Sequence, residues 1–258
     1  MTPALARRSR PAIPVRVSVP VERARRALGD PRASPSLPWI EALSRASRSD
    51  MVAVLGEIGD LVALEEEIRT AQRAGGRSGY AQIRAPFELY ALVRLLRPDH
   101  VVEAGVSSGV SSAHFLAALR KNRHGRLHSI DQPTAQRGVR LADDESPVAI
   151  PPGRASGWAV PSWLRDGWDL RLGPAEKHLP RLVRELPSIG VFLHDDRHTP
   201  SHLRFELATI RPKLAPGAVV LADNTAWTGQ AFPAFARRLG VPWFRRRQSD
   251  LVGLRLEP

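Results

Sequence analysis

From residue 100 to the end of the chain, short apolar runs of β-type residues alternate with stretches of helical periodicity. The β-type runs occupy 100–105, 126–131, 168–172, 189–194, 218–223, 242–247 and 250–256, and the helical stretches occupy 111–122, 175–186, 200–213 and 229–239. This alternation is typical of a mostly parallel sheet with helices on both faces. A short turn around Ser249 separates the last two runs, which predicts an antiparallel hairpin.

The part of the chain before residue 100 has a different character. Residues 1–38 are rich in proline and arginine, which predicts an extended or disordered arm. We expect helices over 39–47, 51–74 and 86–96, so that 39–99 is a helical segment preceding a domain at 100–258. Residues 132–167 are a loop insertion in that domain, and three tryptophans near its end form either a small aromatic core or a cover over a site: Trp158, Trp163 and Trp168.

The first β-type run leads into Glu103 and a turn containing Gly105 and Gly109, with serines between and after the glycines. Because glycine has no Cβ, backbone in such a turn can approach a nucleotide-like ligand closely. The next run ends at Asp131, and a carboxylate in that position can accept both hydroxyls of a ribose. The NAD fingerprint Gly-x-Gly-x-x-Gly is absent from the chain.

This motif resembles that of class I S-adenosylmethionine-dependent methyltransferases, and most closely the branch of catechol O-methyltransferase and the cephalosporin-biosynthesis methyltransferases. The same likeness is found in the segments 156–161, 192–199 and 219–224, and it covers roughly residues 80–258. It implies a Rossmann-like, doubly wound seven-stranded sheet with a reversed last strand. It also implies an enzyme that transfers a methyl group from S-adenosylmethionine to a hydroxyl oxygen of a small molecule.

The resemblance assigns cofactor contacts to particular residues. The loop residues Gly105, Ser107, Gly109 and Ser111 would face the methionine and ribose parts, with Glu103 beneath the loop and Asp131 on the ribose hydroxyls. Glu176 would contact the adenine. For Glu176, a charge interaction with the start of its own helix is an alternative that the sequence leaves open.

Further polar residues follow the fourth and fifth runs. By the resemblance, Asp195, Asp223 and Asn224 would hold Mg²⁺ or another divalent cation, because three oxygen ligands plus water suit that ion. A second alignment places His194 where the family has its aspartate, which would favour a softer ion.

His198 is the candidate general base. Arg197 stands where catechol O-methyltransferase has a lysine, and arginine cannot readily take up a proton. For His198, a hydrogen bond to the start of the next helix is the alternative, and His202 is expected on the surface.

The net charge of +12 raises the possibility of a nucleic-acid-associated methyltransferase or binding protein on the same fold. Arginine accounts for 35 of the 38 basic residues and is scattered, and no Asn-Pro-Pro element follows the fourth run, so we expect a small-molecule acceptor rather than a nucleic acid. No apolar run reaches the ~20 residues of a membrane span. The chain has no cysteine and no apolar N-terminal segment, which favours a cytoplasmic protein; the sequence leaves a homo-oligomer open.

Overall fold

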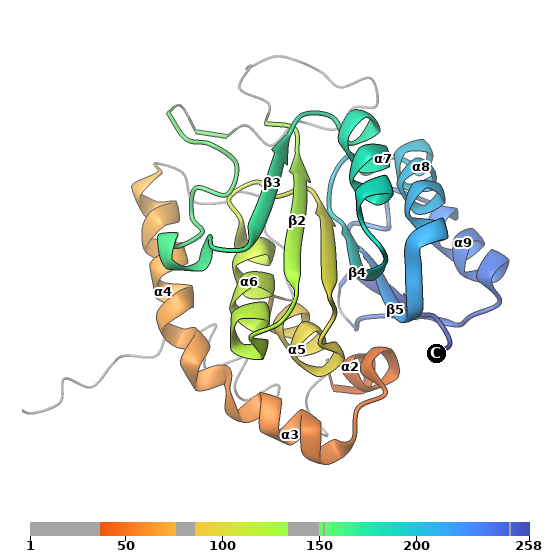
Figure 1. Ribbon diagram of the computed structural model, residues 1–258, viewed down its shortest axis with the longest axis horizontal. Coiled ribbons are helices and arrows are strands. Elements are labelled where there is room, and N and C mark those ends of the chain that lie inside the picture. The colour runs from red at the N-terminus through yellow and green to blue at the C-terminus, as the bar shows by residue number, and fades with distance from the viewer. Residues whose placement is uncertain (1–36, 76–85, 134–149, 152, 248) are drawn as a thin grey trace, which may run out of the picture.

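Seven strands form one sheet with the order β3-β2-β1-β4-β5-β7-β6 (Figure 1). The computed structural model describes residues 37–75, 86–133, 150–151, 153–247 and 249–258. The strands are β1 (His100–Ala104), β2 (Arg126–Asp131), β3 (Trp168–Leu172), β4 (Ile189–His194), β5 (Leu214–Ala222), β6 (Trp243–Arg245) and β7 (Val252–Arg255). The first five are parallel, and β7 runs antiparallel to both β5 and β6. The expected doubly wound sheet with a reversed final strand is therefore confirmed.

Helices cover both faces of this sheet. One layer holds α2 (Leu37–Ser44), α3 (Arg48–Gly56), α4 (Ile58–Ala74), α5 (Pro86–Leu96) and α6 (Val110–Asn122). The other holds α7 (Ala175–Glu185), α8 (Pro200–Ile210) and α9 (Ala231–Leu239), which stand together in Figure 1. Two 3₁₀ turns, η1 (Ser162–Leu164) and η2 (Arg211–Lys213), lie before β3 and β5.

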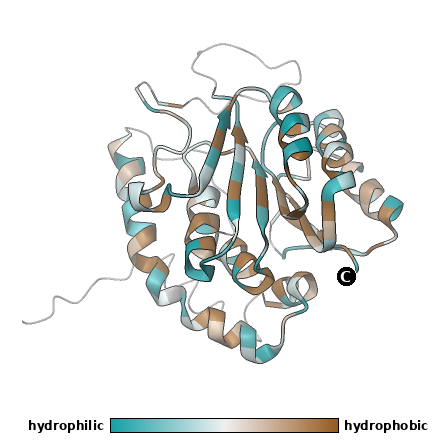
Figure 2. Cartoon of the chain, viewed as in Figure 1, coloured by the Kyte–Doolittle hydropathy of each residue, from teal (hydrophilic) through white to brown (hydrophobic). Residues whose placement is uncertain are grey.

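The two layers follow from alternation along the central strands. In β1, Val101 packs into the core on the α5–α6 side, and its neighbour Val102 packs on the α7–α9 side. In β4, Val191 and Phe192 divide in the same way. Successive side chains of a strand point to opposite faces, so a strand that is apolar throughout contributes side chains to the cores on both faces of the sheet. Figure 2 shows hydrophobic colour on the central strands, whereas hydrophobic and hydrophilic colours alternate along β2 and β3.

The N-terminal helices share the core of the domain. Trp39 Nε1 in α2 donates to the carbonyl of Phe244 in β6 at 3.1 Å. Arg255 in β7 donates to the carbonyl oxygens of Leu43 and Ser44 at 3.0 and 2.6 Å. Thus α2 buttresses the edge hairpin, although more than 200 residues separate the two in sequence.

One expected helix is divided. The periodicity over 51–74 predicted a single helix, but α3 ends at Gly56 and α4 begins at Ile58. The residue between them, Glu57, directs its carboxylate to α5, where it accepts hydrogen bonds from Tyr90 at 2.7 Å and from Arg94 at 2.6 and 2.7 Å. The ion pair between Glu57 and Arg94 lies where the helix is interrupted. Helical periodicity describes neighbouring residues only, so it cannot predict a contact between residues 37 positions apart.

Most other boundaries lie within a few residues of their expected places. Of the arm expected at 1–38, residues 1–36 lie outside the described residues, and Leu37 and Pro38 belong to α2. Much of the loop insertion, 134–149 and 152, also lies outside them. Of the three tryptophans, Trp158 and Trp168 pack against the core, whereas Trp163 is exposed. No described helix is both long enough and apolar enough to cross a membrane.

Candidate functional site

The polar residues at the strand ends lie along one edge of the sheet. Ala104 in β1 is in register with Ile130 in β2 and with His194 in β4, and His194 is in register with Ala222 in β5. The loops that follow these strands therefore start side by side. In a doubly wound sheet this edge, at the carboxyl ends of the strands, is where ligands bind.

The glycine turn fits against the loop after β4. Gly105 has a φ of 92°, and a Cβ added to it would lie 1.9 Å from the carbonyl oxygen of Asp195. Its N–H donates to the carbonyl of Ile130 at 2.9 Å. The side of Gly105 on which a Cβ would lie is filled by the backbone of Asp195. The glycine therefore lets two loops of the site touch each other.

A segment from the loop insertion lies against the other side of the turn. The N–H groups of Gly157 and Ala159 donate to the carbonyl oxygens of Ser107 and Ser108 at 2.8 and 3.0 Å. Gly109, with a φ of 93°, is the N-cap residue of α6, and a Cβ there would lie 2.4 Å from Cγ2 of Val160. The segment 156–160 thus holds the shape of the turn, as a cover over the site would.

Glu103 lies beneath the turn and is fully buried. Its Oε2 accepts hydrogen bonds from Ser112 at 2.6 Å and from Ser129 at 2.7 Å, which join β1 to α6 and β2. Burial raises the pKa of Glu103 to about 7, and the nearby charge of Asp195 acts in the same direction. Ser111, in the first turn of α6, is also buried.

Asp131 closes the turn from β2. Its Oδ1 accepts the N–H of Val106 at 3.0 Å, and its Oδ2 accepts the hydroxyl of Ser156. Burial raises the pKa of Asp131 although these hydrogen bonds act to lower it. Beside it, Ser107 has a φ of 50°, and its buried Oγ has no hydrogen-bond partner among the described residues. A polar atom without a partner in a buried loop is what a site for a polar ligand provides.

The residues expected to bind a cation surround His198. Its Nε2 lies 3.5 Å from Oδ1 of Asp195 and 3.3 Å from Nδ2 of Asn224. Burial and the charge of Asp195 raise the pKa of Asp223 to about 6. Asn224 has a φ of 51°, a conformation that costs energy in a residue other than glycine and is frequent at functional sites. The structure thus brings together His198 and the acidic and amide residues of the expected metal set.

The start of α8 is capped by another residue. Thr199 accepts the N–H of His202 at 3.2 Å, and Pro200 occupies the first helical position. Thr199, and not His198, is therefore the N-cap residue of α8. Arg197 is not a candidate base, because its guanidinium forms an ion pair with Glu176.

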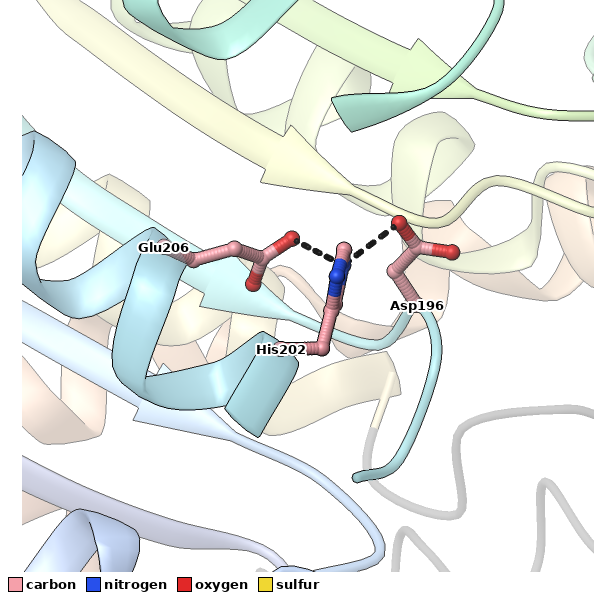
Figure 3. Close-up of side chains that lie close together, drawn as sticks. All are labelled: Asp196, His202 and Glu206. Atoms are coloured by element: carbon pink, nitrogen blue, oxygen red, sulfur yellow. Dashed lines mark hydrogen bonds and ion pairs between the residues drawn. The ribbon is translucent and has the colours of Figure 1, made fainter. Parts of the chain in front are cut away.

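A second cluster of polar side chains adjoins His198, whose ring centroid lies 5.6 Å from that of His194. His194 Nδ1 lies 2.6 Å from Oε2 of Glu206, and both residues are fully buried. His202 is 4% exposed, so the expectation that it lies on the surface is wrong. Its Nε2 lies 3.2 Å from Oε1 of Glu206 and 3.1 Å from Oδ2 of Asp196 (Figure 3).

Sequence reasoning missed Glu206. The signal available was its spacing from His202, because residues four apart share one face of a helix.

Glu176 lies in the first turn of α7, as expected. Its carboxylate pairs with Arg197 and lies 3.3 Å from Nδ1 of His202, so it joins the start of α7 to the loop after β4. The interaction with its own helix start is present too, since a hydrogen bond to backbone N–H contributes to lowering its pKa.

Residues 102–225 match the family model described as "Methyltransferase domain". The chain therefore contains a methyltransferase domain. The matched range runs from within β1 to the loop after β5, so it contains every predicted site residue from Glu103 to Asn224. No curated protein matches the methyltransferase in sequence.

Solved structures of several methyltransferases share the fold at low sequence identity. The O-methyltransferase TomG from Streptomyces achromogenes, involved in tomaymycin synthesis and solved with S-adenosylmethionine, is 20% identical with a TM-score of 0.53 over 76% of this chain and 89% of that one. The methyltransferase PaMTH1 from Podospora anserina, solved with S-adenosylhomocysteine, is 16% identical with a TM-score of 0.52 over 76% and 88%. An O-methyltransferase from Bacillus cereus, also solved with S-adenosylhomocysteine, is 16% identical with a TM-score of 0.50 over 74% and 90%. These likenesses show that the methyltransferase has the class I fold.

Proposed function

We propose that this methyltransferase transfers the methyl group of S-adenosylmethionine to a hydroxyl oxygen of a small molecule. The observation that carries the proposal is the contact between the two loops of the site. Asp195 N donates to the carbonyl of Ala104 at 2.8 Å, and the Asp195 carbonyl fills the space beside Gly105. The glycine turn and the loop that carries His198 therefore contact each other, as the cofactor and acceptor sites must for direct transfer.

The turn fits a cofactor of this kind. The buried hydroxyl of Ser107 has no hydrogen-bond partner within the described segments, and Asp131 offers a carboxylate at the end of β2. We propose that Gly105, Ser107, Gly109 and Ser111 line the methionine and ribose parts, with Glu103 supporting the turn from below. Glu176 stays the predicted adenine contact, a role it would combine with its ion pair to Arg197. When bound, S-adenosylmethionine supplies a methyl group already activated on a sulfonium.

The residues of the chain then have two tasks, to align the hydroxyl with the methyl group and to remove its proton. Asp195 Oδ1 and Asn224 Nδ2 lie 3.5 and 3.3 Å from Nε2 of His198 and would orient the ring. We propose that neutral His198 takes the proton of the acceptor hydroxyl as the new bond forms.

The metal assignment rests on the chemistry of the donors. Asp195, Asp223 and Asn224 offer two carboxylates and an amide, a set that suits Mg²⁺. A cation there would be favourable because the charge of Asp195 helps to raise the pKa of Asp223, and a cation would offset that repulsion. A bound cation would hold the acceptor oxygen and make it more acidic.

We also propose that the enzyme is cytoplasmic. The proposal makes no choice between a monomer and a homo-oligomer. The nucleic-acid alternative gains no support, because the described relatives carry no name that refers to DNA or RNA.

Titration calorimetry with S-adenosylmethionine, followed by a methyl-transfer assay on a panel of phenols, catechols and short RNAs with and without Mg²⁺, tests the function. We expect binding with one site per chain and transfer to hydroxyl compounds alone. Absence of cofactor binding in a folded protein would refute the proposal, and transfer to RNA would refute the small-molecule acceptor.

A further inference from the structure

Asp196, His202 and Glu206 form a compact set of potential metal ligands next to the proposed active site (Figure 3). In the described part of the chain, they are the one group of three histidine, cysteine or acidic residues whose ligand atoms all lie within 4.8 Å of one another. None of the three belongs to the cation site proposed at Asp195, Asp223 and Asn224. The cluster therefore needs an explanation of its own.

Helix geometry presents two of the three donors together. His202 and Glu206 are four residues apart on α8, so their side chains lie on the same face of that helix. Asp196 reaches them from the loop after β4. From Nε2 of His202, the distances are 3.1 Å to Oδ2 of Asp196 and 3.2 Å to Oε1 of Glu206. Two ligands of a tetrahedral zinc ion, each about 2.0–2.1 Å from the metal, lie about 3.3 Å apart.

The hydrogen bonds within the cluster leave one carboxylate oxygen without a donor. Nε2 of His202 carries at most one proton, and two carboxylate oxygens face it. Glu206 is fully buried, and its Oε1 has no hydrogen-bond partner among the described residues although it faces the cluster. A buried carboxylate oxygen without a hydrogen bond is costly. A cation placed among the three donors would satisfy it.

The groups around the three donors have the arrangement found behind metal ligands. A ligating histidine usually donates its second ring N–H to a carboxylate, which orients the ring. Here Nδ1 of His202 lies 3.3 Å from Oε1 of Glu176, which leaves Nε2 directed at the cluster. In the same way, Nδ1 of His194 lies 2.6 Å from the second oxygen of Glu206 and holds that carboxylate in place.

We propose that Asp196, His202 and Glu206 bind one divalent transition-metal ion such as Zn²⁺. A nitrogen donor favours such an ion over Mg²⁺ or Ca²⁺, whose preferred ligands are all oxygens. The ion would reach the site from the side of Asp196, whose side chain is 23% exposed. Its effect would be to tie the loop that carries Asp195 and His198 to α8. This proposal does not depend on the identity of the methyl acceptor.

Zinc binding by tag-free, chelator-treated protein tests the proposal, measured by titration calorimetry and by metal analysis after dialysis. We expect one tightly bound Zn²⁺ per chain. The variants Asp196→Asn and His202→Gln should lose it, and Glu176→Gln should weaken it ~10–100-fold, as is typical for a residue that supports a ligand. Because Glu206 is buried and its loss can lower stability, the partly exposed Asp196 is the preferred variant, with its fold checked by circular dichroism.

Two controls separate this site from others. His124 also faces one carboxylate, that of Asp99 at 2.8 Å, but at the surface, so His124→Asn should leave zinc binding unchanged. Asp223→Asn removes a ligand of the proposed magnesium site and should leave it unchanged as well. The proposal is overturned if the wild-type protein binds no zinc, if Asp196→Asn and His202→Gln bind it as tightly as the wild type, or if Asp223→Asn is the variant that loses it.

Discussion

Asp223 provides a test in which stability and activity should change in opposite directions. The residue is 8% exposed, and burial together with the charge of Asp195 raises its pKa from 3.8 to about 6. At about 1.4 kcal/mol for each tenfold change in acidity, the ionised form costs the folded protein about 3 kcal/mol. The Asp223→Asn variant removes that charge and keeps the size of the side chain.

The sign of the effect depends on pH. Below pH 4 the carboxyl is protonated in both the folded and the unfolded chain, so the charge costs nothing. Between pH 4 and about 6 the unfolded chain loses the proton first, and the stability of the wild-type protein falls. Above about pH 6 the cost is constant. We therefore expect Asp223→Asn to match the wild type near pH 4 and to exceed it by up to about 3 kcal/mol at pH 8, a rise in Tm of roughly 5–10 °C.

The assay is thermal unfolding in excess chelator at pH 4, 6 and 8, with methyl transfer measured separately in the presence of Mg²⁺. The more stable variant should be the less active one, because it lacks a ligand of the proposed cation site. Added Mg²⁺ should raise the Tm of the wild type and leave that of the variant unchanged. If the variant is no more stable than the wild type at pH 8, the ionised Asp223 carboxylate does not destabilise the folded protein, and the reasoning is refuted.

Other substitutions test the remaining parts of the site. Gly105→Ala should destabilise the fold by more than about 1 kcal/mol as well as weaken cofactor binding, because its Cβ would meet the carbonyl of Asp195; unfolding in denaturant with unchanged stability would contradict this. Asp131→Ala should cost ~1.5–3 kcal/mol in the titrated affinity for S-adenosylmethionine, and an unchanged affinity would remove it from the ribose contacts. His198→Ala should reduce turnover ~10²–10⁴-fold with cofactor affinity nearly intact, and a wild-type rate and pH profile would exclude it as the base. Burial acts to raise the pKa of Glu206, but His194 and His202 lower it to about 2, so metal-free protein should lose stability as pH falls from about 4.5 to 2; Glu206→Gln should lack that slope in acid-titrated circular dichroism.

Much of the fold could be predicted from residue patterns because those patterns are local. The strand runs and helices after residue 100 are set by side-chain periodicity, which the chain carries within each segment. The break at Glu57 could not be predicted in this way, since Tyr90 and Arg94 lie 33 and 37 residues away.

The site divides along the same line. A residue's position at a strand end can be predicted, because parallel strands place their carboxyl ends at one edge; that edge is where Glu103, Asp131, Asp195 and Asp223 lie. What each side chain contacts there could not be predicted, since the contacts cross between loops.

The sequence by itself determined the element order, the reversed last strand and the set of polar residues at the edge of the sheet, because strand period, turn residues and chain order are properties of neighbouring positions. The tertiary structure alone decided that Gly105 accommodates the backbone of Asp195, and that His202 and Glu206 are buried beside Asp196. Burial and close approach depend on which segments pack together. A histidine that looks like a surface residue in the sequence can therefore lie at the centre of a charged cluster.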